Sequence, residues 1–158
     1  MFCFCSTKYS QYIVNYVLQF QIFKQSFNLS TQQVFLKKQA VHAAQLNDVI
    51  VDAIQDIKGK KIVKIDLRRL HDAPTDYFII CEGESNVQVR AITDSIYRKI
   101  KETFQTTPSH IEGGLQSTWV VMDYFDIVVH VFHRDTRNFY ELEDLWSDGQ
   151  VKEYVDIN

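Results

Sequence analysis

The 158-residue chain has little of the two residues that most often interrupt regular structure, with five glycines and two prolines. This shortage argues against a collagen-like or low-complexity chain. Cysteine is also scarce, and an odd count of three thiols argues against a disulfide framework and fits a reducing compartment. Long apolar runs are missing: stretches such as Tyr77–Cys81 are far shorter than the roughly 20 residues of a membrane-spanning helix.

Acidic residues are missing from the first part of the chain. Residues 1–46 contain no Asp, Glu or Arg and four lysines, a charge of +4, so the remainder, with 13 basic and 20 acidic side chains, carries −7. An acidic body is a poor match for a phosphate backbone, which proteins bind by neutralising it with Lys and Arg. It suits a basic protein surface better, so we expect a protein partner and no direct sequence-specific nucleic-acid binding.

Residues 1–41 differ from the rest in being rich in aromatic and amide side chains. Lack of acids fits an organellar transit peptide, but lack of Arg does not, and no small-residue cleavage site supports a secretory signal. The third alternative, an extension from an upstream start codon, is the one we favour, with a cytoplasmic protein as the result. Cys3 and Cys5 could be paired metal ligands, but no Cys/His cluster accompanies them. We expect residues 1–41 to be disordered or absent from the natural protein, and their deletion to leave stability and partner binding unchanged.

Residues 42–147 have the composition and periodicity of one globular domain, within a chain that is 46% apolar and 23% charged. Helical spacing covers Leu46–Ile57, Ser85–Phe104 and Asp135–Trp146, with Phe139, Leu142 and Leu145 facing inward on the last helix. Strand patterns cover 61–67, 75–82, 118–124 and 126–132, and a short strand is possible at 110–112. This order predicts an α/β (α+β) fold with a mixed β-sheet flanked by helices, followed by an acidic tail at 148–158.

Local signals mark the ends of two helices. Gly59, which can adopt the left-handed conformation, is expected to end the first helix. Ser85 and Gln88 form a capping box, in which the hydroxyl accepts from the amide of Gln88 and the Gln side chain returns to the amide of Ser85.

Two possible reactive groups are better explained by packing. His130 and His133 are three apart on a strand, so they face opposite sides of the sheet and cannot share a metal ion. Cys81 lies within an apolar strand, where burial raises the pKa of a thiol and makes it inert. We therefore expect one core histidine, one histidine at the strand end, and neither a catalytic residue nor a metal site.

Glu82 and Glu84 flank Gly83 at the junction of a strand and a helix. Their carboxylates could bind Mg²⁺ in a nucleotidyltransferase-like enzyme if Asp123 or Asp126 supplied a third acid. No phosphate-binding glycine-rich loop is present. This enzyme is the alternative to a binding protein.

Aromatic and charged side chains near the second hairpin form the candidate recognition surface. An exposed Trp119 beside the acidic turn Asp123–Asp126 has the character of an interface anchor, because Asp123 would be costly to bury unpaired. The last helix adds Arg137, Tyr140 and Trp146, so the predicted partner-binding residues are Trp119, Asp123, Asp126, Arg137, Tyr140 and Trp146.

Five motifs within residues 44–147 together resemble the ribosomal silencing factor, or Iojap-related, family. They are 75–85 (TDYFIICEGES), 88–92 (QVRAI), 119–123 (WVVMD), 126–132 (DIVVHVF) and 137–146 (RNFYELEDLW). The resemblance implies a nucleotidyltransferase-like fold without catalytic acids or cofactor. It also implies a non-enzymatic repressor of translation that binds protein number fourteen of the large ribosomal subunit, blocks joining of the small subunit, and in some members forms a homodimer.

One residue departs from the family pattern. Phe125 stands where members usually have glycine, and a two-residue type I′ turn needs positive φ at both central positions. We therefore expect a different turn type or a differently shaped hairpin tip.

Overall fold

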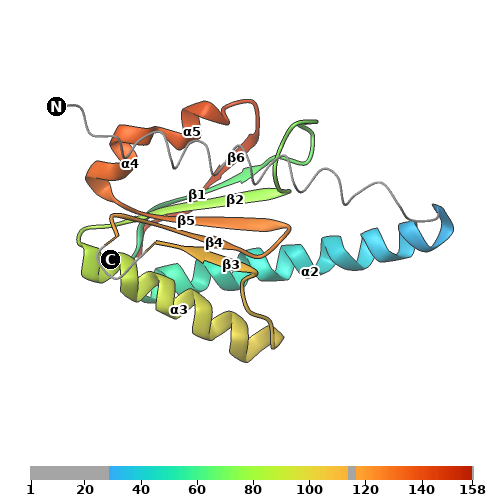
Figure 1. Ribbon diagram of the computed structural model, residues 1–158, viewed down its shortest axis with the longest axis horizontal. Coiled ribbons are helices and arrows are strands. Elements are labelled where there is room, and N and C mark those ends of the chain that lie inside the picture. The colour runs from blue at the N-terminus through green and yellow to red at the C-terminus, as the bar shows by residue number, and fades with distance from the viewer. Residues whose placement is uncertain (1–28, 114–116, 158) are drawn as a thin grey trace.

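The computed structural model describes residues 29–113 and 117–157, with side chains from Ala43 onward (Figure 1). Its elements follow the order predicted from the sequence, with one more strand at the C-terminal end. The helices are α2 (Leu29–Asp56), α3 (Asn86–Phe104), α4 (Arg134–Tyr140) and α5 (Leu142–Leu145). The strands are β1 (Lys60–Asp66), β2 (Tyr77–Gly83), β3 (His110–Glu112), β4 (Trp119–Asp123), β5 (Ile127–His133) and β6 (Gln150–Glu153).

The six strands form one mixed sheet in the order β3-β4-β5-β2-β1-β6. The central pair β2 and β5 is parallel, and the other neighbouring strands are antiparallel. This confirms the predicted α+β architecture. Every residue of β2 is buried, as expected for a strand with apolar residues on both faces.

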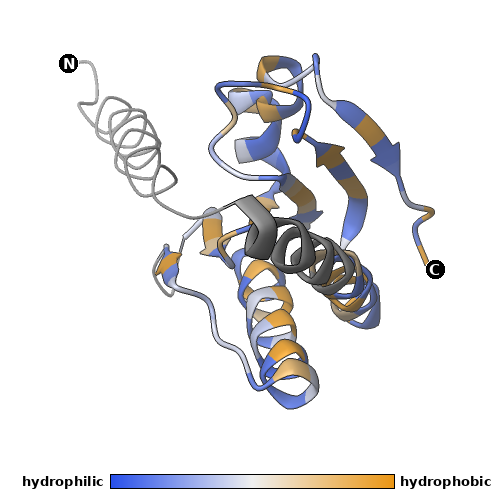
Figure 2. Ribbon diagram, turned by 90° about the vertical axis from the view of Figure 1, so that its right-hand side faces the viewer, coloured by the Kyte–Doolittle hydropathy of each residue, from blue (hydrophilic) through white to orange (hydrophobic). Residues whose placement is uncertain are grey.

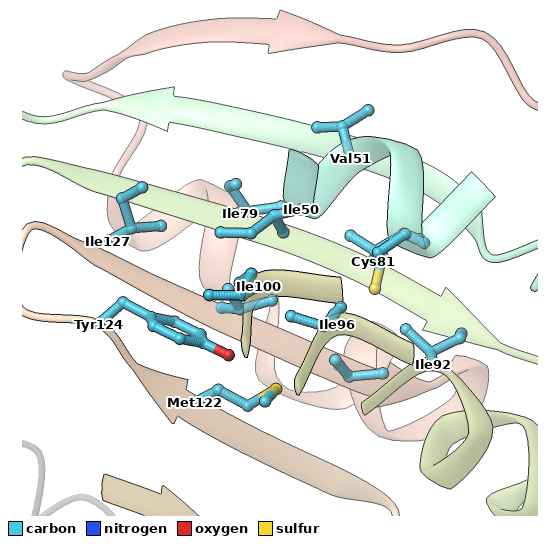
Figure 3. Close-up of a cluster of buried hydrophobic side chains, with 14 of the residues drawn as sticks. Ile50, Val51, Ile79, Cys81, Ile92, Ile96, Ile100, Met122, Tyr124 and Ile127 are labelled. Atoms are coloured by element: carbon cyan, nitrogen blue, oxygen red, sulfur yellow. The ribbon is translucent and has the colours of Figure 1, made fainter. Parts of the chain in front are cut away.

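Helices α2 and α3 cover one face of the sheet (Figure 1). Their contact with the strands forms the larger core cluster, in which Ile92, Ile96 and Ile100 of α3 point toward Ile79 and Cys81 of β2 (Figure 3). The spacing of these isoleucines puts them on one stripe of the helix, which is why α3 buries that stripe against the sheet.

Helices α4 and α5 lie over the opposite face of the sheet (Figure 1). The buried residues there form a second cluster: Ile65, Leu67, Phe78, Ile80, Trp119, Phe132 and Leu142. The hydropathy colouring of Figure 2 shows strands with alternating apolar and polar residues and helices with one apolar side. Within the described residues, no helix is apolar over a length that could cross a membrane.

Three details differ from the sequence prediction at helix ends. Helix α2 begins at Leu29, upstream of the boundary that we placed after residue 41. It ends at Asp56, and the left-handed position that we assigned to Gly59 is taken by Lys58, with a positive φ of 56°. Gly59 is required for space, because a Cβ there would lie 2.4 Å from Ile54 Cγ2. In the capping box, Ser85 Oγ accepts from Gln88 N as predicted, but Gln88 Oε1 accepts from the amide of Glu84.

The C-terminal part differs more strongly. The single helix predicted over Asp135–Trp146 is two helices, because Glu141 adopts a left-handed conformation with φ 44° and ψ 49° between them. The break turns Phe139 and Leu145 outward, and both are 75% exposed, so only Leu142 faces inward as predicted. Residues 148–158, expected as a tail, include β6, which pairs with β1.

Candidate functional site

Trp119, predicted as an exposed anchor, is 9% exposed and lies in the second core cluster. Its ring stacks on Phe132 with centroids 4.7 Å apart and contacts Tyr140 of α4 at 4.9 Å. Its Nε1 donates to Nδ1 of His130 at 3.3 Å. Because α4 covers this end of β4, the prediction that Trp119 is exposed is wrong, and Tyr140 is the ring that reaches the surface above it.

Asp123 was the reason for expecting that this face of β4 is exposed, because an unpaired carboxylate is costly to bury. Asp123 is buried, and its Oδ1 accepts a hydrogen bond of 2.7 Å from the amide of Phe125. A backbone donor from the adjacent turn thus offsets the cost of burying the carboxylate. Asp123 therefore shapes the hairpin turn, and this face of β4 does not open to solvent as we expected.

The hairpin tip is built around Phe125. This residue has a positive φ of 68°, and Asp126 N donates to the carbonyl of Tyr124 at 2.9 Å, which closes a three-residue γ-turn. The turn is thus of another type than I′, as the departure from glycine suggested. Thr75 Oγ1 donates to Phe125 O at 3.0 Å, and the ring of Phe125 is exposed beside the half-buried Asp126.

The exposed apolar surface of this region lies on α4 and α5. Tyr140 is 38% exposed and packs edge to face against Phe139, with centroids 5.1 Å apart. Leu145 is exposed on α5, while Trp146 is half-buried and packs against Phe78 at 5.5 Å. We call Phe139, Tyr140 and Leu145 the α4–α5 apolar surface. Phe139 and Leu145 are absent from the predicted contact residues because a single continuous helix over Asp135–Trp146 would turn both of them inward.

Arg137, predicted to contact a partner, is buried. Its guanidinium donates to Glu143 Oε1 at 2.5 Å and to the carbonyl of Lys61 at 2.8 Å, and it lies 3.5 Å from Glu82. These bonds join α4 and α5 to each other and to β1 and β2. The prediction that Arg137 is at the surface is therefore wrong, and its role in the structure is to fix α4 on the sheet.

Glu82 is 3% exposed and is surrounded by cations rather than by acids. Lys61 Nζ lies at 3.2 Å, Arg137 at 3.5 Å and the more exposed Arg134 at 3.9 Å, while Arg134 also reaches Glu84 at 3.4 Å. A carboxylate that already faces three cations has no free charge to offer a divalent metal ion.

The third acid of the enzyme alternative is also far away. Through β5, Glu82 is in register with Phe132 and Trp119, whereas Asp123 is in register with Val128 and Phe78. Four residues along a strand correspond to about 13 Å, so Glu82 and Asp123 cannot share an ion. Among the described residues no group of three metal-ligating side chains occurs.

The remaining reactive side chains behave as predicted. His130 is buried in the aromatic cluster, and burial lowers its pKa to about 3. His133 at the strand end accepts from the amide of Asp135 at the start of α4, at 3.3 Å. Cys81 is buried and burial raises its pKa to about 12, so the thiol is inert. Cys3 and Cys5 lie outside the described residues.

Comparison with known proteins agrees with this architecture. The family described as "Ribosomal silencing factor during starvation" matches residues 40–158. The ribosomal silencing factor of Halalkalibacterium halodurans is 36% identical over 109 residues, covering 69% of this chain and 92% of its own. That of Bacillus subtilis is 37% identical over 99 residues, covering 63% and 82%.

A solved structure shows the same fold. The crystal structure of a Chromobacterium violaceum protein superposes with a TM-score of 0.62 at 33% identity, covering 73% of this chain and 92% of that one. An α+β domain with this sheet order and these sequence matches defines a class of translation regulators associated with the ribosome. The chain belongs to the ribosomal silencing factor family.

Proposed function

We propose that this protein represses translation by binding protein number fourteen of the large ribosomal subunit and blocking association with the small subunit. Membership of the ribosomal silencing factor family supports the general role. The observation that carries the contact site is the α4–α5 apolar surface, an exposed aromatic and aliphatic group on short helices that a buried tryptophan supports. Such exposed aromatic side chains are typical anchors of protein interfaces.

The predicted partner-binding residues divide into two roles. Tyr140, Trp146 and Asp126 are exposed or half-buried and can contact the partner directly, together with Phe139. Trp119, Asp123 and Arg137 are buried and act through them: Trp119 supports the ring of Tyr140, Asp123 shapes the hairpin turn, and Arg137 fixes α4. The acidic body favours a basic ribosomal protein over naked RNA.

Charge reversal of the exposed ring tests this proposal. We expect Tyr140→Glu to weaken cosedimentation with purified large subunits by about tenfold or more, because it places a charge at an apolar contact. The matched control is Val87→Glu, since Val87 is 79% exposed on α3, across the sheet from α4. Circular dichroism checks that both variants are folded. A folded Tyr140→Glu protein that pellets like the parent protein would remove the α4–α5 apolar surface from the interface.

The proposed activity requires no catalysis. The cation-paired Glu82 and the distance to Asp123 both argue against the nucleotidyltransferase alternative. Saturating Mg²⁺ and nucleoside triphosphate should therefore leave the melting temperature unchanged, whereas a ligand at 100 times its Kd would add about 2.7 kcal/mol. A shift of several degrees with any nucleotide would support the enzyme instead.

We place the protein in the cytoplasm, with an organelle as the alternative if residues 1–41 are a transit peptide, and N-terminal sequencing of the natural protein decides between them. A homodimer of the free protein would compete with the ribosome if it used the α4–α5 apolar surface. Sedimentation velocity of the parent protein and the Tyr140→Glu variant measures whether the free protein is a dimer and whether the dimer depends on this surface.

A further inference from the structure

A groove of about 800 Å³ lies between β6 and the helices α4 and α5. Its floor is formed by β1 and β6, and Glu141, Glu143 and Asp144 form the helical side. The groove adjoins the α4–α5 apolar surface, since Asn138, Glu141 and Asp144 in its lining are sequence neighbours of Phe139, Tyr140 and Leu145, but none of these three side chains lines it. Figure 2 shows β6 on the outside of the sheet, next to the C-terminal end.

The outer edge of β6 has backbone amides and carbonyls that point away from the sheet. Tyr154 N donates to Ile62 O at 2.9 Å, which shows that the amides of Tyr154 and, by alternation, of Lys152 face β1. The amides and carbonyls of Val151 and Glu153 therefore point away from the sheet, and all four residues of β6 are exposed. An open edge of this kind can pair with an extended chain.

The side chains beside that edge are acidic and apolar. Val151 and Glu153 are in register with Ile65 and Val63 of β1, so they stand on the face covered by α4 and α5 and line the groove. Val151 is 52% exposed there. An extended partner would therefore meet an apolar position next to a negatively charged one.

The charges of the groove are unbalanced. Its two cations are engaged with acids, Lys61 with Glu82 at 3.2 Å and Arg137 with Glu143 at 2.5 Å. Glu141, Asp144 and Glu153 are exposed and take part in none of the ion pairs found in the described part of the chain. Three carboxylates beside an open strand edge are complementary to a row of lysine or arginine side chains.

We propose that this groove binds an extended, lysine- or arginine-rich segment of another protein, which joins the sheet as a strand next to β6. Backbone bonds to Val151 and Glu153 supply the register, and the basic side chains pair with Glu141, Asp144 and Glu153. A second copy of this chain fits less well. Pairing β6 with β6 in a continuous antiparallel sheet would place two acid-lined grooves side by side, and like charges at such a junction are repulsive.

The first test uses a capped eight-residue peptide of alternating lysine and valine, added to the ¹⁵N-labelled full chain. We expect chemical-shift changes and slower hydrogen exchange at the amides of Val151 and Glu153. A peptide with glutamate in place of lysine should not bind. A peptide with N-methyl groups on the amides that face β6 should not bind either, because it keeps the charge and lacks the donors. Equal binding of the methylated peptide would overturn strand addition.

The second test reverses charge at two exposed positions. The double variant Asp144→Lys with Glu153→Lys should bind the lysine–valine peptide with an affinity at least about tenfold lower, since two of the three charge pairs become repulsive. The matched control is Asp48→Lys with Glu102→Lys, two exposed acids on α2 and α3 that change the net charge equally. Equal weakening in both double variants would show nonspecific attraction and overturn the site. Concentration-dependent protection of Val151 and Glu153 without peptide would assign the edge to a second copy and would also overturn it. Glu153→Lys alone changes β6 and leaves the α4–α5 apolar surface intact, so its pelleting with large subunits should be unchanged, and this site and the proposed function fail independently.

Discussion

At the scale of single residues, Glu82 shows how a buried charge depends on its partners. Arg137 and Arg134 both approach this carboxylate, but the Arg137 side chain is 8% exposed and the Arg134 side chain is 51% exposed. Water screens the Arg134–Glu82 pair and does not reach the Arg137–Glu82 pair. The two arginines should therefore contribute differently to the free energy of unfolding, although they come from the same helix.

Removal of the inner arginine should destabilise the protein strongly. We expect Arg137→Ala to lower the free energy of unfolding by about 3–5 kcal/mol, because Glu82 and the Lys61 carbonyl lose a buried donor. Arg134→Ala should cost less than about 1 kcal/mol. Urea unfolding of both variants measures the difference. Equal losses would show that the burial of the Arg137–Glu82 contact has no energetic importance.

His130 should make the protein sensitive to acid. Its pKa is lowered to about 3 by burial, against about 6.5 in the unfolded chain. The unfolded state therefore binds the proton first, so the stability that neutral His130 provides is complete above pH 6.5 and is lost as the pH falls toward 3. Between pH 6.5 and 5 this single group should cost about 2 kcal/mol.

The variant His130→Asn isolates this effect, because it stays neutral and keeps an acceptor for Trp119 Nε1. Its absolute stability should be lower, but its stability should fall less between pH 7 and 5 than that of the parent protein. His71→Asn, at an exposed position, is the control. An unchanged pH slope in His130→Asn would show that other groups cause the acid sensitivity.

The residue scale also shows what the sequence could reveal about the site. Burial of Cys81 followed from its place in an apolar strand, and separation of His130 from His133 followed from strand alternation; both are confirmed. The burial of Trp119 and Asp123 could not be inferred, because it depends on Tyr140 of a distant helix and on the amide of Phe125 in a γ-turn. Periodicity reports which face a residue takes and does not report what covers that face.

At the scale of elements, periodicity predicted the strands and the core stripe of α3 because those segments are long and regular. It failed at the α4–α5 junction, where Glu141 takes a left-handed conformation that favours glycine. It also failed at β6, whose four exposed residues have no buried face to generate an alternating pattern. Short elements that rest on pairing with a neighbour leave little signal in their own sequence.

The end of α2 offers a stabilising substitution. Gly59 N donates to Ile54 O and Lys58 N to Gln55 O, the bonds of a Schellman motif with Lys58 in the left-handed position. Lys58→Gly should therefore stabilise the protein by up to about 1 kcal/mol. Lys58 is exposed, and its Cβ makes the left-handed backbone conformation unfavourable, whereas glycine adopts this conformation without strain.

A melt or urea titration measures this gain, and Lys58→Ala is the matched control because alanine keeps the Cβ. Loss of the lysine charge is common to both variants, so any difference between them reports the backbone. If Lys58→Ala stabilised the protein as much as Lys58→Gly, the positive φ at residue 58 would have no cost.

At the scale of the whole molecule, the two ends of the sheet differ in how they are protected. The β3 edge has three residues, whereas the β1 edge is covered by β6, which follows α5 after residues 146–149. Gly149 permits this connection, because a Cβ there would lie 2.4 Å from Ile65 Cγ2 of β1. The last residues are therefore part of the domain, and the predicted tail is a structural element.

Truncation after Ser147 tests the contribution of this strand. It removes the pairs that β6 makes with residues 63–66 of β1, the bond from Tyr154 N to Ile62 O, and the bond from Lys61 N to Asp156 Oδ1 at 2.8 Å. It also removes Tyr154 from the core cluster under α2 and α3. At about 1 kcal/mol for each net hydrogen bond, partly offset by the entropy that the freed strand regains, we expect a loss of about 3–5 kcal/mol. The melting temperature should fall by roughly 10 °C.

Deletion of residues 157–158 alone is the control and should have little effect, since Ile157 is exposed and lies beyond the paired residues. Equal melting temperatures for both truncations would show that β6 adds no stability and would return residues 148–158 to the status of a tail.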